Sequence, residues 1–213
     1  MLTLCIPVLN NFSGLDQMID SAEYGDLVPD RYLIVDNSGG RYKNKNKKVE
    51  IYNPGTNIGV APAWNYSIKN SDEIRIICND DLIFLPETLK IFYEFVCNDK
   101  DSIMWCPAHN AGNAYSCFAI NNKCIELLGY FDEEFAPAYF EDCDYARRML
   151  LINYEITKVP DCKYIHVGSQ TVKNYNLEEL NKHHETFAKN QEYFIRKWGG
   201  IPGQEIYTIP FGK

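Results

Sequence analysis

The sequence lacks three features that would point to common classes of protein. Its eight cysteines include no Cys-x-x-Cys pair, which excludes the usual zinc ribbons and fingers. Lys and Arg number 21 against 29 Asp and Glu, and the net charge of −8 argues against nucleic acid as the main partner. There is no N-terminal signal segment and no apolar run long enough to span a bilayer. We therefore expect a cytoplasmic protein with free cysteines and no membrane span.

What the chain does contain is enough apolar sequence for one core. Its 213 residues are 46% hydrophobic, which fits one α/β domain better than two small ones. Short apolar runs alternate with segments of helical periodicity, and this predicts a mostly parallel, Rossmann-like central sheet flanked by helices. The expected strands are Leu2–Leu9, Arg31–Val35, Val49–Tyr52, Glu73–Cys78, Ile103–Pro107, Tyr115–Ile120, Glu155–Pro160 and Cys162–Val167. The expected helices are Gly14–Ala22, Val60–Ile68, Pro86–Val96, Asn122–Leu128, Tyr145–Ile152 and Leu177–Trp198.

Two adjacent acids follow a buried predicted strand, in the run Asn79-Asp80-Asp81. In open α/β sheets, ligands bind at the carboxyl edge of the strands, where these residues would lie. Polar clusters also follow two earlier strands, at Asn10 and Asp36, and parallel strands would bring all three clusters together. Adjacent acids repel each other and favour a cation or ligand hydroxyls as partners. A solvated turn accounts for the run equally well.

A second acidic block places five carboxylates within residues 132–142, just before a predicted helix. Glu141 and Asp142 then lie at the helix N-terminus, where the dipole stabilises negative charge. An ionised Asp at the rim of a cleft suits general-base chemistry on an alcohol. Helix capping alone is the competing interpretation, and Asp144 and Arg148 have the i,i+4 spacing of a structural ion pair.

Two weaker signals could also contact a ligand. His166 ends a predicted strand before a Gly-Ser turn, which makes a metal-binding role more plausible than for an average histidine. The loop Asn57–Gly59 precedes a predicted helix and could offer backbone N–H groups to phosphate. His183 and His184 lie in the long C-terminal helix, and we expect both on the surface.

Five ordered motifs span residues 2–171. They are Ile6-Pro7-Val8-Leu9-Asn10, Val35-Asp36-Asn37-Ser38, Asn57-Ile58-Gly59 continuing to Asn65, Asn79-Asp80-Asp81, and Gly129-Tyr130-Phe131-Asp132-Glu133 with Glu141-Asp142, Asp144 and Arg148. In this order and spacing they resemble a GT-A nucleotide-sugar glycosyltransferase, close to the family 2 type. His166-Val167-Gly168-Ser169 is similar to an element of rhamnosyltransferase-like members, and the whole resembles glycosyltransferase domains encoded by large algal viruses.

The resemblance implies a metal-dependent, inverting transfer of a hexosyl or deoxyhexosyl group from a UDP-sugar to a glycan hydroxyl, with Mn²⁺ or Mg²⁺ as cofactor. Asp142 would be the catalytic base, Asp81 would bind the metal, and His166 would be a second metal or phosphate contact. The nucleotide-binding residues would be Pro7, Val8, Leu9, Asn10, Asp36, Asn57, Gly59, Asn65, Asn79 and Asp80.

The resemblance also implies one GT-A domain over residues 1–213, which could belong to a longer chain. Its nucleotide-binding half would cover about residues 1–100 and its acceptor half about residues 101–213. Aromatic side chains in His109–Tyr115 and Phe131–Tyr139 could stack on the sugar faces of an acceptor.

Two residues depart from the family pattern. Asn79 replaces the first acid of the usual Asp-x-Asp motif, so the metal would have fewer protein ligands, and Trp64 stands where many relatives have Arg. A sugar-1-phosphate nucleotidyltransferase is a competing function, but its basic, Gly-rich loop is missing because residues 10–14 contain no Lys or Arg. A non-catalytic nucleotide-sugar binding module is a third possibility, against which the presence of Asp142 argues.

Overall fold

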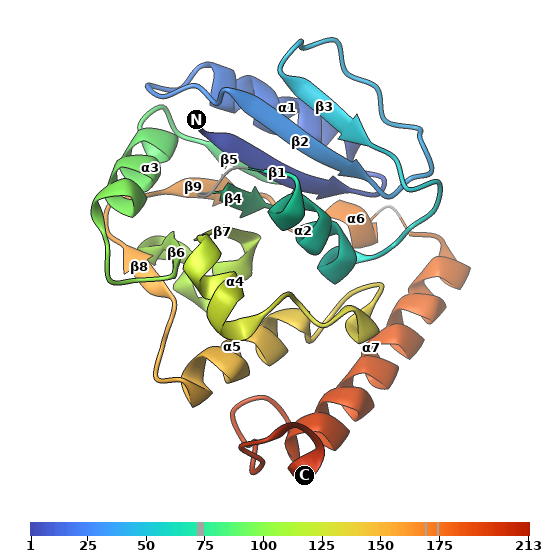
Figure 1. The fold of residues 1–213 in the computed structure, drawn as a ribbon. Helices are drawn as coiled ribbons and strands as arrows, with labels where there is room; N and C mark the ends of the chain where they lie inside the picture. The colour runs from blue at the N-terminus through green and yellow to red at the C-terminus, as the bar shows by residue number, and fades with distance from the viewer. Residues whose placement is uncertain (72–74, 169, 174) are drawn as a thin grey trace.

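The computed structural model describes residues 1–71, 75–168, 170–173 and 175–213. A seven-stranded sheet, ordered β3-β2-β1-β4-β7-β6-β8, forms its centre (Figure 1). Every neighbouring pair is parallel except the two that β7 makes with β4 and β6. The predicted mostly parallel α/β sheet is therefore confirmed. Its strands are β1 (Thr3–Val8), β2 (Arg31–Asp36), β3 (Val49–Tyr52), β4 (Arg75–Cys78), β6 (Met104–Pro107), β7 (Cys117–Ile120) and β8 (Thr157–Val159).

Helices cover both faces of this sheet. They are α1 (Phe12–Glu23), α2 (Val60–Lys69), α3 (Thr88–Asn98), α4 (Asn122–Leu128), α5 (Glu141–Leu151), α6 (Gln170–Lys173) and α7 (Leu177–Trp198). Side chains of α1 and α3 share one buried cluster with Leu4 and Ile6 of β1, whereas α2, α4 and α5 share the other with Cys5. Successive strand residues point to opposite faces, and both faces are buried, so β1 is apolar along its whole length.

A separate two-stranded ribbon joins distant parts of the chain. β5 (Leu82–Phe84) pairs antiparallel with β9 (Tyr164–His166), and Leu82 stands opposite His166. The sequence does not predict β5, because the four apolar residues between the acidic run and Pro86 carry no strand periodicity. This ribbon brings the residues that follow β4 beside the end of β9.

Several element boundaries differ from the prediction. Helix α3 begins at Thr88 rather than Pro86, and α1 begins at Phe12 rather than Gly14. The expected loop after Pro107 is the 3₁₀ segment η1 (Ala108–Ser116). The predicted strand start at Glu73 and the motif residue Ser169 lie outside the described residues.

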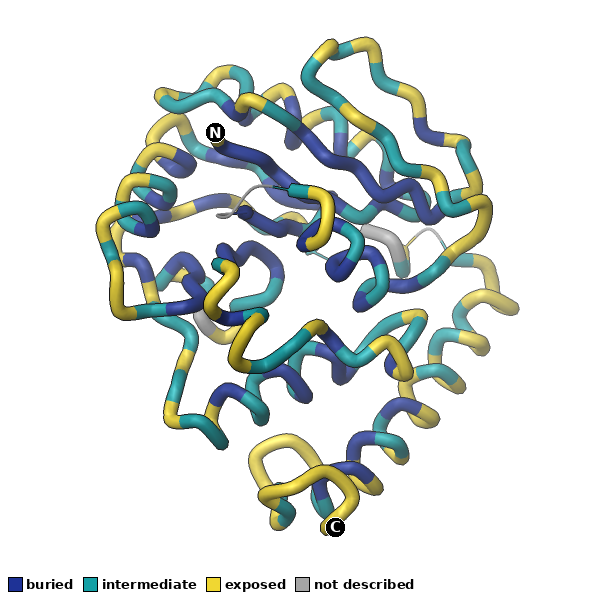
Figure 2. Tube along the Cα trace, in the orientation of Figure 1, coloured by how far each residue is buried: buried dark blue, intermediate teal, exposed yellow. Residues whose placement is uncertain are grey.

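The C-terminal helix α7 is buried at only one end. Its buried side chains are Asn190, Phe194, Lys197 and Trp198, all in its last nine residues. Figure 2 shows the dark blue of buried residues toward the C-terminal end of this helix. Phe194 and Trp198 form a small third cluster with Phe135 and Phe140, apart from the two main clusters. A short 3₁₀ turn, η2 (Glu133–Phe135), carries Phe135 into this cluster. Helix α7 therefore packs against the segment that precedes α5.

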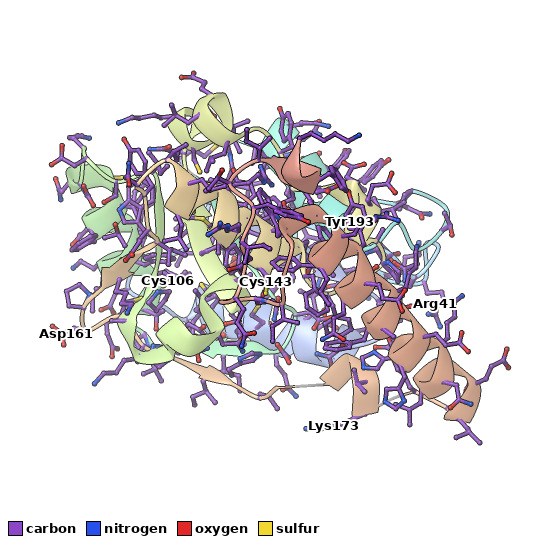
Figure 3. The ribbon with its side chains drawn as sticks, turned by 90° about the horizontal axis from the view of Figure 1, so that it is seen from below. Arg41, Cys106, Cys143, Asp161, Lys173 and Tyr193 are labelled. Carbon is purple, nitrogen blue, oxygen red and sulfur yellow. The ribbon has the colours of Figure 1, made fainter. Side chains whose placement is uncertain are left out.

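The eight cysteines are all free. Cys5, Cys78 and Cys117 are buried within strands. Cys106 on β6 and Cys143 on α5 are labelled in Figure 3. Among the described residues, no helix combines the length and the apolar character needed to cross a membrane.

Candidate active site

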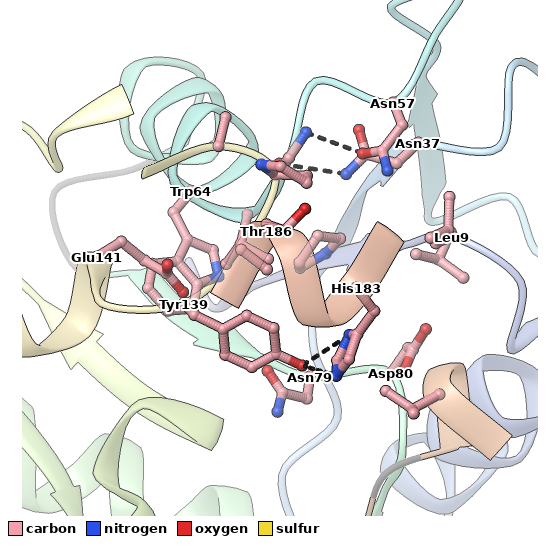
Figure 4. Close-up of a pocket in the computed structure, with 18 of the residues that line it drawn as sticks. Leu9, Asn37, Asn57, Trp64, Asn79, Asp80, Tyr139, Glu141, His183 and Thr186 are labelled. Carbon is pink, nitrogen blue, oxygen red and sulfur yellow. Dashed lines mark hydrogen bonds between the residues drawn. The ribbon is translucent and has the colours of Figure 1, made fainter. Parts of the chain in front are cut away.

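A cavity of about 910 Å³ lies at the carboxyl edge of the parallel strands (Figure 4). The end of β1, the residues after β4 and the loop before α2 form its sheet side. The N-terminus of α5, the end of β9 and one face of α7 close it from the other directions. The volume falls within the range of small-molecule sites in proteins.

The acids Asp80 and Asp81 lie inside this cavity, and each is only 7% exposed. The Asn11 side-chain amide donates to the Asp80 backbone carbonyl at 3.0 Å and approaches its carboxylate at 3.4 Å. Burial, together with the charge of Asp81, raises the pKa of Asp80 to about 7. Two buried carboxylates side by side are costly unless a cation or hydroxyl groups accompany them.

His166 approaches the second of these acids. Its Nε2 atom lies 3.1 Å from Asp81 Oδ1, and the backbone N–H of Val167 donates to the Asp81 carbonyl at 3.0 Å. The Asn113 amide contacts the other ring nitrogen of His166 at 3.2 Å. Asp81 Oδ1 has no aligned hydrogen-bond donor among the described residues. The β5–β9 ribbon thus places two potential metal ligands, from distant parts of the chain, beside each other.

This pair fits a divalent cation of the Mn²⁺ or Mg²⁺ type. Such cations accept carboxylate oxygen, and Mg²⁺ sites commonly have one or two protein carboxylates, with phosphate and water as the remaining ligands. Within the described ranges, no three His, Cys, Asp or Glu side chains form a cluster that could hold a metal. Asp81 and His166 would therefore be the two protein ligands of the cation. The presence of Asn79 where the family motif has an acid agrees with this small number of protein ligands.

The second acid pair, Glu141 and Asp142, opens α5 and also lines the cavity. Glu141 is 6% exposed, and its Oε2 atom has no hydrogen-bond partner among the described residues. Burial and the neighbouring charge of Asp142 raise the pKa of Glu141 to about 8. Asp142 Oδ1 accepts a hydrogen bond from the Cys143 backbone N–H at 2.7 Å. The two acids differ: Glu141 is deeply buried, and Asp142 is only partly covered.

Asp144 is structural, as its spacing indicates. Its carboxylate pairs with Arg148 at 2.9 Å and with Lys197 at 2.6 Å, and it accepts a hydrogen bond from the Trp198 indole at 2.9 Å. It is fully buried and is absent from the cavity lining. Helix α5 is thereby anchored to the buried end of α7.

Asn190 of α7 fixes the segment before α5. Its side-chain amide donates to the backbone carbonyls of Phe135 at 2.5 Å, Ala138 at 2.7 Å and Tyr139 at 3.2 Å. Tyr139 and Phe140 have φ angles of 81° and 73°, a conformation that non-glycine residues adopt only when their surroundings hold them. The sequence analysis missed this role, because an Asn inside a helix carries no signal of a distant partner.

His183, which we expect on the surface, is partly covered, and it faces the cavity. His183 lines the cavity, and the Tyr139 hydroxyl lies 3.3 Å from both of its ring nitrogens (Figure 4). Glu179, Lys182 and Thr186 line the same wall, at spacings of three and four residues that place them on one face of α7. That spacing is visible in the sequence. The sequence does not indicate, however, which polar face of α7 lines a cavity. His184 is exposed, as expected.

Three of the predicted nucleotide-binding residues, Asn10, Asp36 and Asn65, do not line the cavity. The Asp36 carboxylate accepts from the backbone N–H groups of Ser38 at 2.9 Å and Tyr42 at 3.2 Å, so it holds the turn after β2. The Asn65 amide donates to the Phe131 carbonyl at 2.9 Å and joins α2 to the acidic segment.

Asn37, beside Asp36, reaches the cavity instead. Its amide donates to the Gly59 carbonyl at 3.2 Å, and its carbonyl oxygen accepts from the Ile58 N–H at 3.2 Å. Its position directly after a strand was the only signal in the sequence. The predicted site residues that do line the cavity are Pro7, Val8, Leu9, Asn57, Gly59, Asn79, Asp80, Asp81, Asp142 and His166.

The aromatic residues expected to meet an acceptor divide into two groups. Both ring nitrogens of His109 are engaged with backbone carbonyls, those of Cys162 at 3.0 Å and Tyr164 at 2.9 Å, and His109 is absent from the lining. Tyr115 and Tyr139 do line the cavity.

Comparison of sequences finds one short stretch of similarity. No family model matches the chain. A protein of Leishmania donovani described as "Galactofuranosyl glycosyltransferase" is 33% identical over 79 residues, which cover 37% of this chain and 17% of that protein.

Comparison of structures covers nearly the whole chain. The solved structure of the mannosyltransferase PcManGT from Pyrobaculum calidifontis, in complex with GDP-Man and Mn²⁺, has a TM-score of 0.62 and 15% identity. The similar region covers 94% of this chain and 65% of the other. The chain thus spans less than two-thirds of either protein, and it shares the fold of a solved glycosyltransferase.

Proposed function

We propose that this chain is a metal-dependent glycosyltransferase domain of GT-A type, which moves a sugar from a nucleoside diphosphate sugar to a hydroxyl group of a glycan. The observation that supports this most is the meeting of two acid pairs in one cavity. Asp80 and Asp81 enter it from the sheet, and Glu141 and Asp142 enter it from α5. The local similarity to a galactofuranosyl glycosyltransferase and the fold shared with a mannosyltransferase agree with this function.

The charge of the lining supports metal dependence. Lys182 is the only Lys or Arg among the described residues that line the cavity, and it faces five acids there. A diphosphate would be repelled from such a cavity by Coulomb interaction unless a cation accompanied it. When bound, Mn²⁺ or Mg²⁺ would neutralise the charge that grows on the departing diphosphate. Asp81 and His166 are the residues that we assign to hold it.

We assign the proton transfer to Asp142. Its carboxylate would accept the proton of the acceptor hydroxyl while that oxygen bonds to the anomeric carbon of the donor sugar. The bond from that carbon to the diphosphate oxygen breaks in the same step, and the nucleoside diphosphate leaves with the electron pair. Attack from the face opposite the leaving group inverts the anomeric configuration.

The sequence motifs and the structural comparison point to different bases in the donor. The resemblance of the motifs favours uracil, whereas the solved structure with the same fold contains GDP-Man. In this chain the region around Leu9, Asn37 and Asn57 lies away from the acids of α5 in Figure 4 and would receive the nucleoside. Titration with UDP and GDP distinguishes the two bases.

A thermal-shift panel of UDP, GDP and their sugar derivatives, with and without Mn²⁺, tests the proposal. We expect stabilisation that requires both a nucleotide and the metal, since only the combination satisfies the acids. Incubation with donor and glycan should then release the free nucleoside diphosphate. Formation of pyrophosphate would indicate nucleotidyl transfer instead, and bound but unchanged donor would indicate a binding module. A panel without any metal-dependent shift would contradict the proposed site.

A further inference from the structure

Besides Asp81 Oδ1 of the metal pair, three buried polar atoms lie on the wall of the cavity without a hydrogen-bond partner among the described residues. They are the indole Nε1 of Trp64, the hydroxyl of Tyr115 and Oε2 of Glu141. Trp64 is 3% exposed, so water cannot reach its indole freely. Leaving a buried polar group without a partner destabilises the folded state, and native proteins contain few such groups. Three on one cavity wall therefore indicate a ligand that supplies the missing partners.

The three side chains belong to one part of the cavity. The rings of Trp64 and Tyr115 are nearly parallel, with an interplanar angle of 21° and centroids 6.2 Å apart. The charge of Asp142 acts on both Tyr115 and Glu141 and contributes to their raised pKa values. Figure 4 draws Trp64, Tyr139 and Glu141 on one side of the cavity and Leu9, Asn37 and Asn57 on the other. This wall is thus separate from the proposed nucleoside side.

The chemistry of the three atoms selects the ligand. An indole N–H only donates, and a tyrosine hydroxyl both donates and accepts. The carboxyl of Glu141, whose pKa is raised to about 8 by burial and by Asp142, carries its proton near neutral pH and can do both as well. A phosphate offers only acceptors and would meet the charge of Asp142. Hydroxyl groups satisfy donors and acceptors together, and aromatic faces pack against the C–H face of a sugar ring.

We propose that Trp64, Tyr115 and Glu141 form a subsite that binds the ring hydroxyls of the transferred sugar, between the metal pair and Asp142. This inference rests on the proposed function and adds the residues that select the sugar. The hydroxyl pattern of the sugar then decides which nucleotide sugars bind, because a mismatched hydroxyl leaves a buried group unpaired.

Calorimetric titration of four variants tests the subsite. Trp64→Phe, Tyr115→Phe and Glu141→Gln each remove or alter one of the three atoms with little change of shape, and Tyr130→Phe is the matched control because Tyr130 is 42% exposed and outside the lining. The ligands are UDP, UDP-galactose, GDP and GDP-mannose, each with Mn²⁺. The measured quantity is the ratio of the dissociation constant of the nucleotide to that of its sugar derivative.

We expect this ratio to fall about five- to tenfold in Tyr115→Phe and Trp64→Phe, since each loses one hydrogen bond to the sugar. Glu141→Gln should lower it for some sugars and raise it for others, because an amide has a fixed donor and a fixed acceptor. Binding of UDP or GDP alone should stay unchanged in all variants, and Tyr130→Phe should match the wild type. Trp64→Phe also removes packing volume and could prevent folding. In that case Tyr115→Phe and Glu141→Gln decide whether the subsite exists.

A ratio that stays unchanged in Tyr115→Phe and Glu141→Gln overturns the subsite and shows that water alone pairs with these atoms. If neither nucleotide binds the wild-type chain, the proposed function fails instead. Titration with methyl mannoside and methyl galactoside then still decides the subsite. Monosaccharide binding that weakens in the same variants supports it, and the absence of such binding overturns it.

Discussion

The two acid pairs of the cavity share a chemistry but differ in how the fold supports them. Asp80 and Asp81 follow a central strand and are held by Asn11 and by the β5–β9 ribbon. Glu141 and Asp142 open a helix and follow two left-handed residues. In each pair, burial and the neighbouring charge raise the pKa of the first acid, to about 7 for Asp80 and about 8 for Glu141.

This difference in support indicates a difference in role. In the sheet pair, Asp81 lies beside the imidazole of His166, so these two side chains can bind one cation together. A metal site needs ligands that are held in fixed positions, and the neighbouring strands provide this. Among the described residues that line the cavity, Lys182 of α7 is the only Lys or Arg that could face the helix pair. The second acid of this pair, Asp142, meets the cavity at the N-terminus of α5. We therefore expect substitutions in the first pair to affect metal and nucleotide binding, and substitutions in the second to affect transfer.

We expect the largest difference between transfer and nucleotide binding in Asp142→Asn. The amide keeps the shape but cannot accept the proton of the acceptor, so transfer should fall about a thousandfold. Binding of the nucleotide with Mn²⁺ should remain, and release of nucleoside diphosphate in single-turnover experiments measures the difference. Asp161→Asn, at an exposed position outside the cavity lining, is the control. Loss of nucleotide binding in Asp142→Asn would give this residue a different role.

Asp81→Ala should have the opposite effect. At a hundredfold excess over its dissociation constant, a ligand stabilises a protein by about 2.7 kcal/mol, and we expect the metal-dependent part of this stabilisation to disappear. The thermal shift with nucleotide and Mn²⁺ should then equal the shift without Mn²⁺. A metal-dependent shift that survives the substitution would place the cation elsewhere.

Asn190→Ala tests the support of the helix pair from outside the cavity. The substitution removes one amide donor from three backbone carbonyls, so the free energy of unfolding should fall by about 2 kcal/mol. Because the loop before α5 then loses its anchor, transfer should decrease more than donor binding. Asn98→Ala removes an exposed amide that bonds only within α3 and should change neither quantity. Equal losses of transfer and donor binding would mean that Asn190 serves general stability alone.

The last prediction concerns the pH dependence of stability, measured as a slope per pH unit. The pKa of Glu141 rises from 4.5 to about 8 on folding, because burial and the charge of Asp142 disfavour its ionised form. Between these values the unfolded chain binds fewer protons than the folded one, so stability falls as pH rises, by at most about 1.4 kcal/mol per pH unit. Glu141→Gln should flatten this part of the curve in chemical denaturation at pH 5 to 8. An unchanged slope would show that Glu141 ionises normally.

The sequence predicts those parts of the fold that depend on local patterns. Continuous apolar runs identify the strands of a sheet that is covered on both faces, and α7 is predicted over its full range. The strand β5 is not predicted, because its three residues form a strand only by pairing with β9, more than seventy positions away in the sequence. The acids of the site are found because they follow a strand or open a helix.

The rest of the site depends on tertiary contacts that no local pattern reports. Asp36 has the residue type and the position of a base-binding acid, yet its carboxylate closes its own turn, and Asn37 faces the cavity instead. His183 occupies a polar stretch of a long helix, where a cavity-facing and a solvent-facing histidine look the same. Predicted roles for Asp81, His166 and Asp142 stay predictions, and the substitutions above test the two acids.

The single face of α7 that runs from Glu179 to Asn190 links two properties that could otherwise vary independently. Its first turns border the space where substrate would lie, and its later turns hold the backbone that aims Asp142. Lys182 and Thr186 can therefore change while Asn190 keeps this backbone in place, and such changes would reshape the cavity for new substrates. His183 differs from them because it also contacts the hydroxyl of Tyr139. A helix divided in this way allows specificity to diversify during evolution while the reactive groups keep their alignment.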